Sequence, residues 1–304
     1  MDLAVRYEQY ISSRERIFQK RVFVKEEKRK AFQKSLDEWW NTTDRSKMSF
    51  KRIWFRETFY STVSPLHIAA ECGDDVKMEL ILAAEVEIDR TDGAGDTALH
   101  SASTAKCVKL LVEHGFSLES RNGFDMTPLH TAIFSRCPEA AEQLIVCGAN
   151  VNATFGNERP GMHPPNATGL VTEIPMLDIL LTAGCEMTTE SFHMQVRHGN
   201  LNIVREFLHR GFDVNAVGFK GQTALHFACM TQVSRQRMSY DMKFLIAHLL
   251  IENGVKVNAI DDEGNTAWHR ISKTSRLSKE LRDLLEEQMS LESDNFGFKR
   301  LRTN

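Results

Sequence analysis

A four-residue pattern, Ser/Thr-Pro/Ala-Leu/Trp-His, recurs along this chain of 304 residues. It begins at Ser64, Thr97, Thr127, Thr223 and Thr266. The first three starts are 33 and 30 residues apart, and the gap of 96 residues from Thr127 to Thr223 is close to three times 32. Such a period is typical of a repeat protein, in which each unit buries its apolar face only against its neighbours.

The second half of each unit also recurs. Four segments combine a Leu- or Ile-rich stretch, a glycine and a short extended piece: "KLLVEHGFSLES", "EQLIVCGANVNA", "REFLHRGFDVNA" and "HLLIENGVKVNA". The Ser or Thr that opens a unit can cap a helix, and proline suits the first helical position. A glycine can end the second helix in the left-handed conformation. The pattern predicts helix, turn, helix, stop and hairpin, with stops at Gly115, Gly148, Gly184, Gly211 and Gly254.

This unit resembles the ankyrin repeat, which has about 33 residues and a Thr-Pro-Leu-His signature. The resemblance covers residues 64–290 and implies an all-α fold with short β-hairpin turns, an ankyrin-repeat solenoid of six or seven units within 61–290. Residues 1–60 would form a helical N-terminal extension and cap, and 291–304 a C-terminal tail. The units are expected near 64–96, 97–126, 127–152, 160–188, 190–222, 223–265 and 266–290, with inserts at 153–175 and 230–243.

The fourth unit is degenerate. Pro164 and Pro165 fall where its first helix is expected, and proline breaks helix interiors. Its hairpin is cut short, because Gly184 precedes Glu190, the start of the next unit, by only 6 residues. Glu190 replaces the usual Ser or Thr, and we expect its carboxylate to cap the helix. The insert at 153–175 is the strongest local candidate for function, although disorder is an equal alternative.

The N-terminal segment differs in charge from the rest of the chain. Residues 1–58 carry 15 basic and 9 acidic side chains, whereas the whole chain has a net charge of −3. Residues 3–40 have helix-like apolar spacing, and 48–60 could cover the first repeat. A basic segment with aromatic residues also fits contact with nucleic acid or an anionic membrane. Because acidic residues interrupt it, we favour a solvated helix face.

The histidine of the four-residue pattern invites a search for metal or catalytic sites. Repeat units stack about 10 Å apart, whereas the ligands of one zinc ion lie about 4 Å from one another. One histidine per unit therefore does not make a zinc site. "GAGDTA" at 93–98 matches a dinucleotide-binding motif but lies in a hairpin turn. We expect no catalytic, cofactor or metal residue, and the resemblance implies that each histidine, with His193 in the same position, braces a hairpin.

Composition indicates the cellular compartment. No run of 18 apolar residues suggests a transmembrane helix, and the first 20 residues lack the apolar core of a signal peptide. The six cysteines contain no Cys-x-x-Cys pair and are expected to be free thiols. We therefore predict a cytoplasmic protein, with the nucleus also open to it.

The surface is where function is expected. In ankyrin-like arrays, hairpin tips and the exposed ends of first helices contact partners, and the two inserts add further candidates. Carried over by position, these partner-binding candidates are Phe124, Met126, Phe134, Ser135, Arg159, His163, Arg197, His198, Phe219, Lys220, Gln222, Met230, Thr231, Arg235 and Arg237, with Asp262, Glu263 and Asn265 at the last tip. Asn152, Asn215 and Asn258 occupy a position at which some ankyrin proteins are hydroxylated.

The predicted function is a non-enzymatic protein-interaction module or scaffold, which binds a partner protein through the concave face, hairpin tips and inserts of the ankyrin array. One alternative is a substrate adaptor for a ubiquitin ligase, which would need a C-terminal box that "SLESDNFGFKRLRTN" does not resemble. A second alternative is a nuclear or membrane-surface factor that uses the basic N-terminal arm.

Overall fold

The computed structural model describes Lys34 and residues 64–83, 90–156, 163–230, 240–271 and 276–295. These residues divide into two compact units. The N-terminal unit holds 64–156 and 175–186, and the C-terminal unit holds 163–174 and 187–295, in each case within the described ranges. The proposed N-terminal extension and its cap at 48–60 lie outside the described residues, apart from Lys34.

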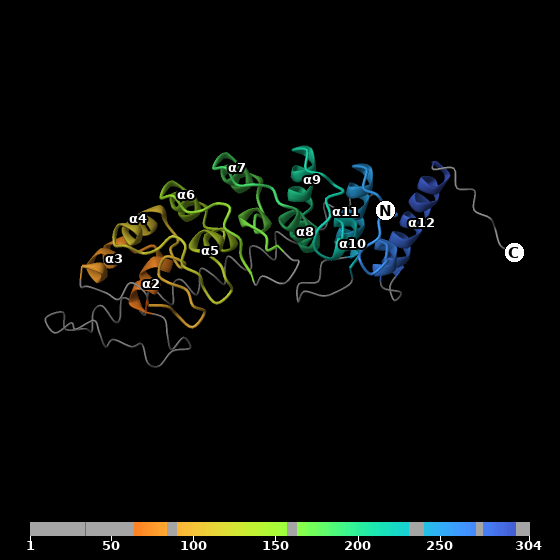
Figure 1. The fold of residues 1–304 in the computed structure, drawn as a ribbon. Coiled ribbons are helices and arrows are strands. Elements are labelled where there is room, and N and C mark those ends of the chain that lie inside the picture. The colour runs from red at the N-terminus through yellow and green to blue at the C-terminus, as the bar shows by residue number, and fades with distance from the viewer. Residues whose placement is uncertain are drawn as a thin grey trace. The chain divides into compact units, whose positions relative to one another are not determined.

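The N-terminal unit consists of paired helices (Figure 1). The second helices α3, α4 and α6 lie next to one another in chain order, while α2 packs on α3 and α5 on α6. The helices of this unit are α2 (Pro65–Cys72), α3 (Asp75–Leu82), α4 (Ala105–Glu113), α5 (Pro128–Phe134), α6 (Pro138–Val146) and α7 (Ile174–Thr182), which has only its first residue outside it.

The C-terminal unit repeats this arrangement. α8 packs on α9, α10 on α11 and η5 on α12, and the first helices α8, α10 and η5 follow one another in the stack. Its elements are η3 (Ala167–Gly169), α8 (Thr189–His198), α9 (Leu201–His209), η4 (Phe219–Gly221), α10 (Ala224–Cys229), α11 (Tyr240–Glu252), η5 (Ala267–Arg270) and α12 (Arg276–Asn295), where η marks a 3₁₀ helix.

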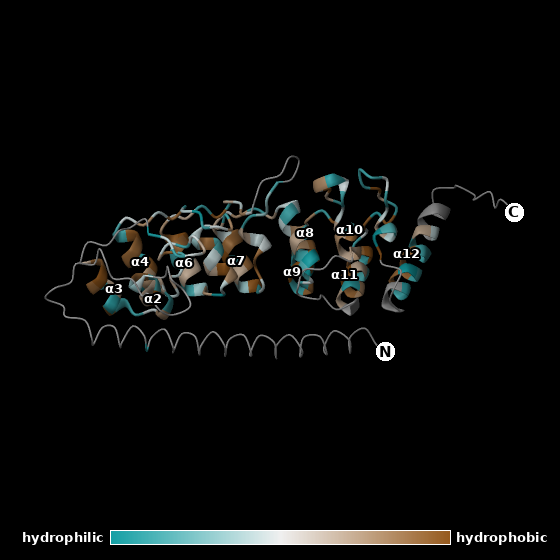
Figure 2. Ribbon diagram, turned by 90° about the horizontal axis from the view of Figure 1, so that it is seen from below, coloured by the Kyte–Doolittle hydropathy of each residue, from teal (hydrophilic) through white to brown (hydrophobic). Residues whose placement is uncertain are grey.

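The apolar positions of the repeat form the core. The leucine of the four-residue pattern is buried in four units, as Leu66, Leu99, Leu129 and Leu225. In α12, Leu281 and Leu285 are buried, and the coloured part of this helix in Figure 2 also contains many hydrophilic residues. Five glycines end second helices with positive φ, as predicted: Gly115, Gly148, Gly184, Gly211 and Gly254.

Three of the first helices are not regular α-helices, and of these only the one in the fourth unit was predicted to be irregular. In the second unit, which is three residues shorter than the first, residues 98–101 form turns instead of an α-helix. In the fourth and seventh units, the 3₁₀ helices η3 and η5 take this place. The hairpins are mostly turns, and isolated antiparallel bridges join Val217 with Thr223 and Ile260 with Thr266.

Glu190 does not cap α8, so that prediction was wrong. The cap is Thr188, whose side chain accepts a hydrogen bond from the backbone N–H of Ser191. Thr188 lies four residues after Gly184, where Asn152 and Asn215 follow their own glycines by the same interval. The chain thus enters α8 directly from the position where other units begin a hairpin, which places Glu190 inside the first turn.

Parts of the predicted inserts and tail belong to the folded core. In the 153–175 insert, Asn166, Ala167, Thr168 and Val171 are at most 2% exposed, so this stretch is not a removable loop. Residues 240–243 of the second insert lie in α11, with Met242 buried. Residues 291–295 of the proposed tail belong to α12. Apolar periodicity alone does not show where a neighbouring repeat supplies burial, so the sequence does not reveal these contributions.

Candidate protein-interaction surface

Three hairpin tips are each held by one side chain near the start of the tip, Asp92, Asn122 or Asp261. The Oδ1 atom of Asp92 accepts hydrogen bonds from the backbone N–H groups of Ala94 and Asp96, at 2.8 and 2.9 Å. Asn122 binds Phe124 and Met126 in the same way, and Asp261 binds Glu263 and Asn265. These side-chain hydrogen bonds to the backbone fix the conformation of the tip.

Neighbouring tips are joined through their backbones at the same repeat position. The N–H of Gly123 donates to the carbonyl of Ala94 at 2.8 Å, and the N–H of Asp262 donates to the carbonyl of Lys220 at 3.0 Å. Gly221 has φ +68, and a Cβ there would lie 3.0 Å from the backbone nitrogen of Asp262. Glycine at this tip therefore serves both the left-handed turn and the close approach of the next hairpin.

The histidines brace the hairpins, as the resemblance implies. His67 Nε2 lies 2.8 Å from the carbonyl oxygen of Asp96, and His130 Nε2 lies 3.0 Å from that of Ala153. His100 and His226 make the same contact with Met126 and Asn265. A carbonyl only accepts, so Nε2 carries the proton in each ring.

The other ring nitrogen caps the helix. The backbone N–H of Thr127 donates to Nδ1 of His130 at 3.1 Å, and Thr97, Thr223 and Thr266 donate to their own histidines in the same way. The rings of His100, His130 and His226 therefore have both nitrogens in hydrogen bonds and are neutral. Burial lowers the pKa of His130 to about 4, and it also lowers the pKa values of His67, His100 and His226. Among the described residues no group of His, Cys, Asp and Glu could hold a metal ion.

His193 is the exception among these histidines. α8 begins at Thr189, so no threonine N–H is placed to donate to Nδ1. Its Nε2 is buried without a hydrogen-bond partner, and the ring lies 4.8 Å from that of Phe227. Burial lowers the pKa of His193 to about 4, against a smaller raising effect of the Ala216 carbonyl. The absence of Ser or Thr at position 190 was the sequence signal that could have indicated this difference.

The asparagines that follow the glycine stops form hydrogen bonds between successive repeats. Asn215 Nδ2 donates to the carbonyl of Gly254 at 3.1 Å, and its Oδ1 accepts from the N–H of Lys256 at 2.7 Å. Asn152 makes the same pair of bonds to Gly184 and Glu186. Hydroxylation of Asn152, Asn215 and Asn258 stays a prediction. A modifying enzyme would act on the first two only after these inter-unit bonds open.

The partner-binding candidates differ widely in exposure. Phe124, at a hairpin tip, is 69% exposed, and Phe134, at the end of α5, is 68% exposed. His163, Arg197, His198 and Lys220 are exposed, whereas Met126, Ser135, Phe219 and Met230 are half-buried. Gln222 is only 5% exposed, so its assignment to the interaction surface was wrong. Arg159, Thr231, Arg235 and Arg237 lie outside the described residues.

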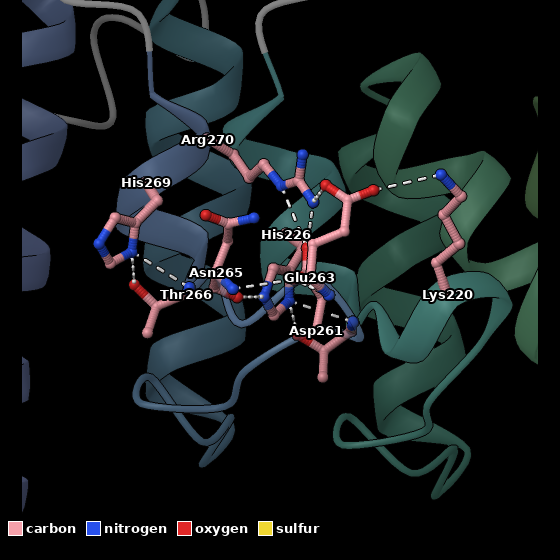
Figure 3. Close-up of polar contacts among 9 residues, drawn as sticks. Lys220, His226, Asp261, Glu263, Asn265, Thr266, His269 and Arg270 are labelled. Atoms are coloured by element: carbon pink, nitrogen blue, oxygen red, sulfur yellow. Dashed lines mark hydrogen bonds and ion pairs between the residues drawn. The ribbon is translucent and has the colours of Figure 1, made fainter.

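A polar network crosses the tips of the C-terminal unit (Figure 3). Arg270 donates from Nε to Oδ2 of Asp261 at 3.2 Å, and its Nη2 contacts the same oxygen and Oε2 of Glu263. Lys220 Nζ lies 3.2 Å from the other oxygen of Glu263. Burial by itself would raise the pKa of Asp261, but hydrogen bonds from Arg270 and from two backbone N–H groups outweigh it and hold the pKa at about 2.

The cysteines are present as thiols and not as disulfides. Three of them, Cys107, Cys185 and Cys229, are buried. Burial raises the pKa of the Cys229 thiol to about 12, so this thiol is protonated at neutral pH. No helix in the described part of the chain has the length and apolar composition to cross a membrane.

Known proteins share this repeat. The chain is 27% identical to the nuclear factor NF-kappa-B p105 subunit of Gallus gallus over 211 residues, which are 64% of this chain and 20% of that protein. It is 25% identical to the E3 ubiquitin-protein ligase KEG of Arabidopsis thaliana over 254 residues, 73% of this chain and 14% of that protein. It therefore spans a fifth or less of each of these relatives.

A solved structure shows the same fold. The human ASB11 ankyrin repeat domain matches with a TM-score of 0.56 at 20% identity, covering 72% of this chain and 96% of that one. The family model for ankyrin repeats in three copies matches residues 64–155 and 192–289. These matched segments make up more than half of the chain and contain the five Ser/Thr-x-x-His patterns. Ankyrin repeats are generally protein-interaction modules, and this chain belongs to the ankyrin repeat family.

Proposed function

We propose that this chain is a non-enzymatic interaction module that binds a partner protein through its hairpin tips and the exposed ends of its first helices. The observation that carries the proposal is the exposure of Phe124 and Phe134, 69% and 68%, on one repeat. Large aromatic side chains are favoured anchors in protein interfaces, where burial of each ring removes a large apolar area from water.

These two rings lie on either side of α5, the first helix of one repeat. Phe124 belongs to the tip that enters α5, and Phe134 is the last residue of α5. Seven helical residues rise about 10 Å. A partner segment that lies along α5 would therefore contact both rings. The tip is a rigid platform, because the side chain of Asn122 holds it at two backbone N–H groups.

Photo-crosslinking tests this proposal. A benzophenone amino acid is placed at position 124 or 134, and in a control at position 146, where Val146 is 77% exposed at the end of the second helix α6. We expect the same partner protein to be crosslinked from 124 and 134 and not from 146. Equal adducts from all three positions would show that exposure alone, and not this surface, decides the contacts.

The cellular role follows as part of the same proposal. A protein of this kind would act in the cytoplasm or the nucleus, where its relative p105 is named a nuclear factor. The relative KEG is an E3 ubiquitin-protein ligase, which favours the adaptor alternative. Co-precipitation of the crosslinked partner with a ubiquitin ligase would separate the adaptor from a simple scaffold.

A further inference from the structure

Two cationic side chains from neighbouring repeats converge on one carboxylate at the tips of the C-terminal unit. Lys220 Nζ lies 3.2 Å from Oε1 of Glu263, and Arg270 Nη2 lies 3.1 Å from Oε2 (Figure 3). Lys220 and Glu263 occupy the same position in adjacent hairpins, each three residues before its repeat threonine. The backbone bond from Asp262 to Lys220 fixes the distance between the two tips.

Arg270 is held in place independently of Glu263. Its guanidinium donates from Nε and Nη2 to Asp261, whose side chain is fully inaccessible to solvent. Asp261 is itself anchored by the backbone N–H groups of Glu263 and Asn265. The guanidinium would therefore keep its orientation if the Glu263 side chain swung away, so the anion-binding position is already formed.

Of the three side chains, Lys220, Glu263 and Arg270, that of Glu263 is the easiest to displace. Its side chain is 49% exposed, and that of Lys220 is 51% exposed. Exposed ion pairs of this kind contribute little to stability, because solvent screens the two charges. Displacement of this carboxylate is therefore cheap, whereas displacement of the buried Asp261 would leave a desolvated charge without its partner.

We propose that Lys220 and Arg270 form a binding site for a phosphoryl group, which Glu263 occupies in the free protein. The ligand class is a phosphorylated serine or threonine in a segment of a partner protein. A carboxylate of a partner would have to displace the carboxylate of Glu263, which makes the same contacts. Because Glu263 is tethered in the same chain, its effective concentration at the site is in the millimolar range. A phosphoryl group carries about −1.5 to −2 charges and three acceptor oxygens, and it can outcompete one carboxylate.

This site rests on the proposed function, because it would recognise one phosphorylated segment of the partner protein at the hairpin tips. Its test does not need the partner. Binding of a small phosphate probe can succeed or fail whatever protein contacts Phe124 and Phe134, so the two proposals fail separately.

The experiment follows the side-chain Nε–H signal of Arg270 by NMR in the full chain during titration with inorganic phosphate, with chloride at equal ionic strength as the reference. Glu263→Gln removes the competing charge at nearly constant size. We expect a saturable shift in this variant with at least about tenfold tighter binding than in the wild-type protein, the factor that corresponds to 1.4 kcal/mol. Addition of Lys220→Gln to the variant should abolish that gain.

Glu79→Gln is the matched control, because Glu79 also lies beside an exposed lysine, Lys106, at 3.6 Å. It should leave phosphate binding unchanged. A second arm compares one short Gly/Ser peptide with and without a phosphoryl group. Binding of the phosphorylated form alone to Glu263→Gln supports the proposal. No saturable phosphate shift, an equal shift with chloride, an equal gain in Glu79→Gln, or phosphate binding without phosphopeptide binding (an adventitious anion only) would each overturn it.

Discussion

The imidazole of His130 donates from Nε2 to the carbonyl oxygen of Ala153, 3.0 Å away and 23 residues along the chain. The same ring accepts at Nδ1 from the N–H of Thr127. One buried side chain thus joins the start of α5 to the segment that follows α6. His67, His100 and His226 make the same bond from Nε2 to a hairpin carbonyl, so these repeated histidines are structural.

Replacement of His130 by alanine should destabilise the N-terminal unit. The change leaves the N–H of Thr127 and the carbonyl of Ala153 without partners in a buried region, at a cost of about 2–4 kcal/mol. Urea unfolding followed by circular dichroism measures this loss. His114→Ala serves as the control, because His114 is exposed and its Nδ1 bonds to the carbonyl of Leu110 in the adjoining helix α4, within the same repeat. Equal losses in the two variants would contradict the bracing role.

Stability should fall as the pH is lowered from 6.5 towards 4. Burial lowers the pKa values of His130 and His193 to about 4 from the ordinary 6.5. Between these values the unfolded chain binds protons that the folded chain does not, so stability is complete above pH 6.5 and decreases below it. Each histidine contributes on the order of 3 kcal/mol to this loss. Urea midpoints at pH 7, 5.5 and 4.5 would reveal it.

His193→Phe should weaken this pH dependence and raise stability at pH 5. The replacement removes a titrating ring and an unpartnered buried nitrogen while keeping aromatic contact with Phe227. We expect a gain of about 1–2 kcal/mol at pH 5 and less at pH 7. An unchanged slope of stability against pH would mean that His193 keeps its proton equilibrium on folding.

Glu119→Asn should stabilise the N-terminal unit. Glu119 lies four residues after Gly115 and accepts a hydrogen bond from the N–H of Asn150 at 2.8 Å. Asn152 and Asn215, at the same repeat position, accept an equivalent bond and also donate to the carbonyl of the next glycine. Asparagine at 119 adds that donor towards Gly148 and should gain about 1 kcal/mol. Thermal melting with Glu119→Ala as the comparison checks this, and melting below wild type would refute it.

Gly221→Ala should cost more than Gly148→Ala. Both glycines have positive φ, at +68° and +94°, so both substitutions carry the strain of a left-handed residue, about 1–2 kcal/mol. Only at Gly221 would the new Cβ also meet the backbone of Asp262, because space is open around Gly148. Paired urea titrations measure the difference. Equal costs would show that the two tips can separate without loss.

The sequence determined the repeated local features, because each depends on residues a few positions apart. The spacing of Ser/Thr and His located the caps, the apolar positions located the core, and the glycines located the ends of the second helices. The interpretation of the histidines as braces also held for His67, His100, His130 and His226, since each bonds from Nε2 to a hairpin carbonyl. The prolines at 164 and 165 correctly marked a unit without a regular first helix.

Only the tertiary structure decided how the irregular units are filled, because burial there comes from residues far along the chain. Asn166 shares hydrogen bonds with Ser191, and Gln195 donates to the carbonyls of Thr168 and Val171, so an apparent loop is part of the core. The burial of Gln222 and the convergence of Lys220 and Arg270 on Glu263 likewise depend on the approach of neighbouring hairpins. A one-dimensional pattern assigns each residue to its own unit, whereas these contacts form between units.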